Sequence, residues 1–136
     1  MTAQQKYLGG CLCGGIRYEI HGEIGEIIQC YCQRCRKSNG TAFASNAPVK
    51  IADFYFVSGE HLLKKFQSTP TTQRCFCSQC GSPILSIKQD TPEHYRLRIG
   101  TLDSVIPNRP SMHIFVADKA EWDQICDDVP QYAQRP

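Results

Sequence analysis

The stretch Cys75-Phe76-Cys77-Ser78-Gln79-Cys80-Gly81 places three cysteines close together and ends on a glycine. A Cys-x-x-Cys turn lets both of its sulfur atoms reach one metal ion from a tight bend, and zinc prefers such thiolate ligands. Gly81 can adopt the positive φ that folds the chain back after the turn. Residues 77–80 therefore predict one half of a tetrahedral zinc site.

A second pair of cysteines lies near the start of the chain. Cys11 and Cys13 are one residue apart and precede two glycines. In an extended Cys-x-Cys segment both side chains point to the same face of the strand, and the glycines permit a tight turn after it. This pair would supply the other half of the site.

A third group, Cys30, Cys32 and Cys35, combines the two spacings. Its three sulfur atoms could hold one face of a second zinc ion and leave the fourth position free, which is the arrangement of catalytic zinc; four cysteines are typical of a structural site. Cys75 could instead close this second site. Spacing alone leaves open whether residues 77–80 join the first pair or the middle group.

Composition limits the classes of protein that this chain can be. Its 136 residues, 41% of them hydrophobic, predict one folded domain over 1–136. Clustered cysteines indicate metal binding in a reducing compartment, and no secretory or membrane-spanning pattern is found, so we expect a cytoplasmic protein. The net charge of +2 does not favour nucleic acid, and Arg34, Arg36 and Lys37 fit a solvated face.

Alternating apolar and polar residues predict a mainly β fold. The alternation is clearest over 16–20 and 95–99. Further short strands are expected over 24–30, 42–49, 54–57, 62–66, 72–77, 84–88 and 112–116, most of them bounded by Gly, Pro, Asn or Asp.

Two short helices are predicted, over 33–38 and 119–126. Asp118 and Glu121 match a capping box for the second helix, which would bury Trp122 and leave Cys126 as a buried, unliganded thiol. The four histidines, His21, His61, His94 and His113, have no metal-like spacing and are expected to be ordinary surface or core residues. Asp103 is expected to bond nearby amides in a turn.

Several motifs, in order and spanning nearly the whole chain, resemble the glutathione-dependent formaldehyde-activating enzymes, whose domain also occurs in centromere protein V. They are Gly10-Cys11-Leu12-Cys13-Gly14-Gly15-Ile16-Arg17-Tyr18, Cys30-Tyr31-Cys32-Gln33-Arg34-Cys35-Arg36-Lys37-Ser38, Gly59-Glu60, Arg74-Cys75-Phe76-Cys77-Ser78-Gln79-Cys80-Gly81, Gly100-Thr101-Leu102-Asp103 and Trp122.

The resemblance implies several small curved antiparallel sheets around cysteine-ligated zinc, similar to methionine-R-sulfoxide reductases, with short helices. It also implies two Zn²⁺ ions per chain. Cys11, Cys13, Cys77 and Cys80 match the structural zinc ligands, and Cys30, Cys32 and Cys35 match the catalytic zinc ligands.

The implied activity is that of a zinc-dependent carbon–sulfur lyase, which forms or breaks a thiol–aldehyde adduct such as S-hydroxymethylglutathione. The partners would be glutathione or a similar thiol and a small aldehyde, with no nucleic acid and no membrane. A non-catalytic zinc module that binds a protein partner is the main alternative, and two closed four-cysteine sites would favour it. A thiol redox sensor using residues 30–35 is a third possibility.

Overall fold

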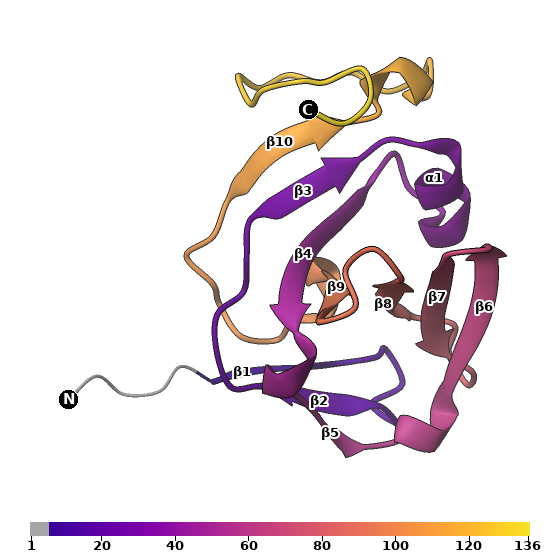
Figure 1. Ribbon diagram of the computed structural model, residues 1–136, viewed down its shortest axis with the longest axis vertical. Coiled ribbons are helices and arrows are strands. Elements are labelled where there is room, and N and C mark those ends of the chain that lie inside the picture. Colours follow the sequence, from indigo (N-terminus) through magenta and orange to yellow (C-terminus); the bar gives the residue numbers. More distant parts are fainter. Residues whose placement is uncertain (1–5) are drawn as a thin grey trace.

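Two β-sheets and one short helix make up the computed structural model, which describes residues 6–136 (Figure 1). The small sheet has the order β1-β2-β5, and the large sheet has the order β10-β3-β4-β9-β8-β7-β6. The strands are β1 Tyr7–Gly10, β2 Arg17–Ile20, β3 Ile27–Cys30, β4 Ala44–Lys50, β5 Phe54–Ser58, β6 Leu63–Thr69, β7 Thr72–Cys77, β8 Pro83–Lys88, β9 His94–Arg98 and β10 Pro110–Ile114. The mainly β prediction is confirmed.

The helix α1, Gln33–Asn39, follows β3 directly and agrees with the predicted helix. The Cys32 sulfur accepts a hydrogen bond from the Cys35 amide and caps its first turn. Gly40 ends the helix in the left-handed conformation, with its amide bonded to the Arg36 carbonyl.

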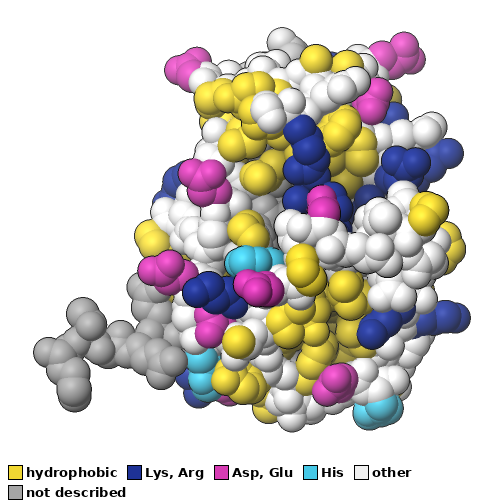
Figure 2. Space-filling view, in the orientation of Figure 1, with side chains coloured by type: hydrophobic (Ala, Val, Ile, Leu, Met, Phe, Trp, Pro, Cys, Tyr) yellow, Lys and Arg dark blue, Asp and Glu magenta, His cyan; other side chains and the backbone are white. Residues whose placement is uncertain are grey.

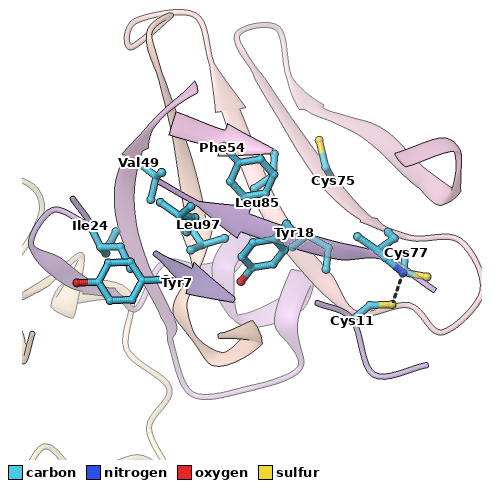
Figure 3. Close-up of a cluster of buried hydrophobic side chains, with 14 of the residues drawn as sticks. Tyr7, Cys11, Tyr18, Ile24, Val49, Phe54, Cys75, Cys77, Leu85 and Leu97 are labelled. Carbon is cyan, nitrogen blue, oxygen red and sulfur yellow. Dashed lines mark hydrogen bonds between the residues drawn. The ribbon is translucent and has the colours of Figure 1, made fainter. Parts of the chain in front are cut away.

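One face of the large sheet packs against the small sheet and forms the main core (Figure 3). Apolar residues recur there at every second position: Leu97 on β9 pairs with Leu85 on β8, and Leu85 pairs with Cys75 on β7. Tyr18 on β2 stacks on Phe54, with the ring centroids 4.9 Å apart. These side chains are almost fully buried, so this face is the apolar interior of the molecule.

The intervening residues of the same strands point to the opposite face of the large sheet, because successive side chains in a strand alternate. Arg98 pairs with Asn46 on β4, and Arg96 pairs with Ser86 on β8, which in turn pairs with Arg74 on β7. This second face is polar and cationic, and it lies on the side of α1.

Strand β10 is the one parallel neighbour within the described sheets, since it runs alongside β3 in the same direction. The segment after residue 128 folds back over it. His113 on β10 donates its amide to the Pro130 carbonyl, and Phe115 donates its amide to the Gln134 carbonyl. The final residues are therefore held against the large sheet, at the top of Figure 1.

The predicted C-terminal helix over 119–126 is wrong. Residues 116–118 form a single 3₁₀ turn, and residues 119–126 are irregular, with the Lys119 ammonium bonded to the Asp123 backbone carbonyl. Trp122 is 71% exposed, so the apolar face expected to drive the helix is not buried. Cys126 is likewise exposed, not buried as predicted.

Strand β1 was not predicted, because Gly9 and Gly10 give it no alternating pattern. The Cys-x-Cys segment after it forms a turn instead of the predicted extended strand, and the Gly14 amide donates to the Cys11 carbonyl. Asp103 accepts from the Arg17 guanidinium at 2.7 Å, instead of from backbone amides as expected. No helix within residues 6–136 has the length and apolar character needed to cross a membrane.

Candidate functional site

The structure brings seven cysteines together in two groups. In the first group the sulfur atoms all lie within 4.8 Å of one another, and the members are Cys11, Cys13, Cys77 and Cys80. The Cys11 and Cys13 sulfurs are 3.5 Å apart, and those of Cys13 and Cys77 are 3.9 Å apart. A tetrahedron with metal–sulfur bonds of about 2.3 Å places its corners about 3.8 Å apart, so the four residues fit a tetrahedral metal ion.

Two turns position this four-cysteine group. Gly81 has a φ of 78°, and its amide bonds to the Cys77 carbonyl, as the sequence predicted for the bend after the Cys-x-x-Cys turn. The Cys11 sulfur accepts from the Ile16 amide at 3.2 Å. A hydrogen bond with the Ser82 hydroxyl lowers the pKa of Cys80 to about 5, which favours the thiolate that a metal ligand requires.

The second group, Cys30, Cys32 and Cys35, lies where β3 ends and α1 begins, and its sulfur atoms also lie within 4.8 Å of one another. The hydrogen bond between Cys30 and Cys32 raises the pKa of Cys30 and lowers that of Cys32, so the group shares its protons unequally. No fourth cysteine, histidine or carboxylate joins it among residues 6–136, and the arrangement leaves one position of a tetrahedron open.

Cys75 does not close this second group. It is 2% exposed, lies in the main core with Leu85 and Leu97, and is drawn among them in Figure 3. Its neighbours Arg74 and Phe76 point to the other face of β7, as the alternation of a strand requires. Burial raises the pKa of Cys75, which keeps it a neutral core thiol.

A cavity of about 170 Å³ opens beside the three-cysteine group, on the polar face of the large sheet. Its lining includes all three cysteines and the apolar side chains of Ile28, Ile114 and Phe115. Six cationic side chains also line it: Arg34, Arg74, Lys88, Arg96, Arg98 and Arg135. Figure 2 shows Lys and Arg side chains gathered on this part of the molecule, below the C-terminal segment.

The sequence did not predict that most of these cations gather at one site. Of the six, only Arg34 belongs to the basic group over residues 34–37 that the sequence pointed out. Arg96 and Arg98 were visible as the polar half of an alternating strand, and such residues ordinarily face solvent. The missing information was the register that brings them beside Lys88 on β8 and, beyond it, Arg74 on β7. Arg36 and Lys37, expected on a solvated face, do not line this cavity.

Phe115 lines the cavity in a left-handed conformation, with φ 55° and ψ 38°. It is the one non-glycine residue with positive φ in the described chain. Such strain persists where the surrounding structure enforces it, and it clusters at functional sites. The Arg135 guanidinium lies 5.9 Å from the centre of the Phe115 ring, so the C-terminal segment forms part of the cavity wall.

The histidines stay outside both cysteine groups, as predicted. His113 is 1% exposed; its Nδ1 bonds to the Tyr31 hydroxyl at 3.1 Å and its Nε2 to Asp127 at 2.9 Å. Tyr31 stands between Cys30 and Cys32 in sequence but does not line the cavity. This chain of hydrogen bonds supports the strand that carries Cys30.

Comparison with known proteins gives three findings. Residues 6–118 match the model of a family described as "Glutathione-dependent formaldehyde-activating enzyme". A protein of Halomonas elongata named "Putative glutathione-dependent formaldehyde-activating enzyme" is 29% identical over 125 residues, which are 86% of this chain and 79% of that protein. A crystal structure of a Rhodobacter sphaeroides protein is similar with a TM-score of 0.61 and 27% identity, over 76% of this chain and 92% of that one.

Proposed function

The chain belongs to the glutathione-dependent formaldehyde-activating enzyme family, and from this premise we propose that it forms and breaks the adduct of a thiol with a small aldehyde. Glutathione and formaldehyde are the proposed pair, with S-hydroxymethylglutathione as the adduct. The thiol sulfur bonds to the carbonyl carbon, the C=O π bond becomes a C–O single bond, and the thiol proton ends on that oxygen. Atoms and electrons balance without any oxidant, and we propose a cytoplasmic enzyme of the carbon–sulfur lyase class.

The proposed cofactor is zinc, two ions per chain. Cys11, Cys13, Cys77 and Cys80 would hold a structural ion, and Cys30, Cys32 and Cys35 would hold a catalytic one. Zinc with an open position supplies Lewis acidity, which favours a thiolate over a thiol and polarises a carbonyl.

The observation that carries the proposal is that the three-cysteine group opens into the cavity whereas its possible fourth ligand, Cys75, lies in the core. A closed second site was the expectation of the rival, a non-catalytic zinc module that binds a protein. With Cys75 in the main core, on the face of β7 opposite Arg74, the closure of the second group that this rival predicted is not present within the described chain.

The chain's own residues contribute binding and electrostatics. Arg74 donates toward the Cys35 sulfur, with the two atoms 3.8 Å apart, and holds that sulfur in the cavity wall. The cationic lining favours the thiolate form of a substrate and the negative charge that develops on the aldehyde oxygen during C–S bond formation. Ile114 and Phe115 cover one side of the cavity and limit access by water.

The test is the rate of exchange between glutathione, formaldehyde and their adduct, measured above the spontaneous rate with protein of known zinc content. We expect acceleration by the native protein and a loss of about 100-fold or more in the Cys32→Ser variant, since one ligand of the working ion is removed. Cys126→Ser is the matched control, because Cys126 is exposed and belongs to neither group. No acceleration by fully loaded native protein would contradict the proposed reaction.

A further inference from the structure

Apart from the thiolates of the three-cysteine group, no anionic side chain within residues 6–136 lines the cavity beside its cations. No aspartate or glutamate is among its lining residues, and none of the six lining Lys and Arg side chains forms an ion pair within residues 6–136. Solvent can screen such charges at an exposed surface, but burial removes that screening. The unpaired charge is therefore most costly where the side chains are most buried.

Arg98 is the most buried of the six, at 6% exposure. Its terminal nitrogens bond only to neutral acceptors: the Asn46 side chain at 2.8 Å, the Ser86 hydroxyl at 2.6 Å and the Arg96 carbonyl at 3.3 Å. Its Nε is buried without a hydrogen-bond partner. Burial lowers the pKa of Arg98 to about 10 and the nearby Arg74 charge adds to this, yet at neutral pH the guanidinium stays charged.

Arg74 lies on the same face of the sheet as Arg98, with Ser86 on β8 between their strands, and its charge acts on Arg98. One of its terminal nitrogens contacts the Cys35 sulfur, while its Nε and its other terminal nitrogen are buried without partners. Two like charges with three unpaired guanidinium nitrogens thus adjoin one cavity wall, directly beside the candidate metal centre. An anion bound there would offset both the repulsion and the lost hydrogen bonds.

We propose that Arg74 and Arg98 form a subsite for a carboxylate of the substrate thiol. The inference rests on the proposed function, which supplies the thiol as glutathione. Because Arg74 contacts the Cys35 sulfur and lines the same cavity as Arg98, a carboxylate bound by both must lie close to the reacting sulfur. In glutathione the glycyl carboxylate is separated from the sulfur by fewer bonds than the γ-glutamyl one, so the glycyl carboxylate is the group assigned to this subsite.

The test uses a ligand that cannot react: the glutathione analogue in which a methyl group replaces the thiol, compared with the same peptide carrying a C-terminal amide. Calorimetry on zinc-loaded native protein should give binding of the acid about tenfold tighter than that of the amide. Arg98→Gln should abolish this preference, and Arg74→Gln, at a half-buried position, provides the same measurement if the first variant does not fold. Equal binding of acid and amide by native protein would overturn the proposal.

Two further arms separate the subsite from its rivals. Lys88→Gln removes one charge from the same cavity, and it should keep most of the preference; an equal loss in this variant and in Arg98→Gln would mean a diffuse cationic field in place of a subsite. If Arg74→Gln weakens zinc binding but leaves the preference intact, Arg74 serves only the thiolates, against the proposal.

The outcome is independent of catalysis. A preference for the acid in protein that does not accelerate adduct exchange would uphold the subsite and reject the proposed reaction. Catalysis without a preference for the acid over the amide would uphold the proposed reaction and reject the subsite.

Discussion

At the scale of single residues, the two candidate metal centres differ in what surrounds their sulfurs. Cys80 bonds to the Ser82 hydroxyl, and Cys11 accepts a backbone amide, so the four-cysteine group is held by its own turns. Cys35 instead contacts the Arg74 guanidinium, which belongs to a distant strand. Loss of a cysteine should therefore affect folding stability differently at the two centres.

Cys80→Ser is expected to destabilise the whole chain, because the free energy of binding structural zinc is also free energy of folding. We expect a loss of about 4 kcal/mol or more in urea unfolding, or no folded protein. Cys126→Ser should change stability by less than about 0.5 kcal/mol. A fully folded, zinc-loaded Cys80→Ser protein would refute the assignment of the structural site.

Two glycines offer a second test at this scale. Gly59 and Gly40 both have positive φ, at 75° and 66°. A Cβ at Gly59 would collide with the Gly15 carbonyl oxygen, whereas a Cβ at Gly40 would meet nothing within 4 Å. Gly40→Ala should cost about 1 kcal/mol from backbone strain alone, and Gly59→Ala clearly more. If denaturant unfolding gave the same loss of stability for both variants, the collision at residue 59 would be relieved without cost.

At the scale of elements, the strands were the most predictable part of the fold. Residues 72–77 were among the predicted short strands, and β7 has the predicted bounds. The C-terminal helix failed because its capping box describes only local preference, and Trp122, which was expected to anchor its buried face, is exposed. The cysteine groups could be predicted from the family motifs. The cavity could not, because it depends on the register between strands, and no local sequence pattern determines that register.

The attachment of the C-terminal segment to β10 is expected to depend on pH through Asp127. The hydrogen bond with His113 lowers the pKa of this carboxyl below its ordinary value. Because the pKa of this carboxyl is lower in the folded state than in the unfolded state, its ionised form stabilises the fold. This contribution to stability is complete above the unfolded-state pKa and is lost as the pH falls through the folded-state pKa.

Asp127→Asn should accordingly reduce stability at pH 7 and have less effect at pH 3, because the contribution is lost as the pH falls toward the lowered folded-state pKa. Urea unfolding of both proteins at the two pH values measures this, with Asp128→Asn as the control, since Asp128 is exposed and lies next in sequence. A native-to-variant difference that grows toward acid would contradict the stated role of the bond to His113.

At the scale of the whole molecule, the large sheet separates two environments. Its apolar face meets the small sheet, and its cationic face meets α1 and the C-terminal segment. The four-cysteine group joins the loop after β1 to the end of β7, and so ties the small sheet to the large one. The three-cysteine group ties β3 to α1 alone, at the cavity.

Metal removal should therefore proceed in two stages. A chelator is expected to take the ion first from the open three-cysteine group, with the secondary structure retained, and to unfold the chain only when the second ion leaves. Circular dichroism recorded against the number of ions released measures this. A single step, in which structure is lost in proportion to the first ion, would show that both centres are structural.

The alternation of faces along β7, β8 and β9, which one irregularity near Cys75 interrupts, also has an evolutionary consequence. A point substitution at Arg74, Ser86 or Arg98 alters the cavity without changing the neighbouring core side chains, so relatives can acquire new substrates by substitution alone. An insertion or deletion of one residue in any of these strands would exchange the two faces, sending guanidinium groups into the interior. Descendants of this scaffold should vary freely in cavity chemistry while the lengths of these three strands stay fixed.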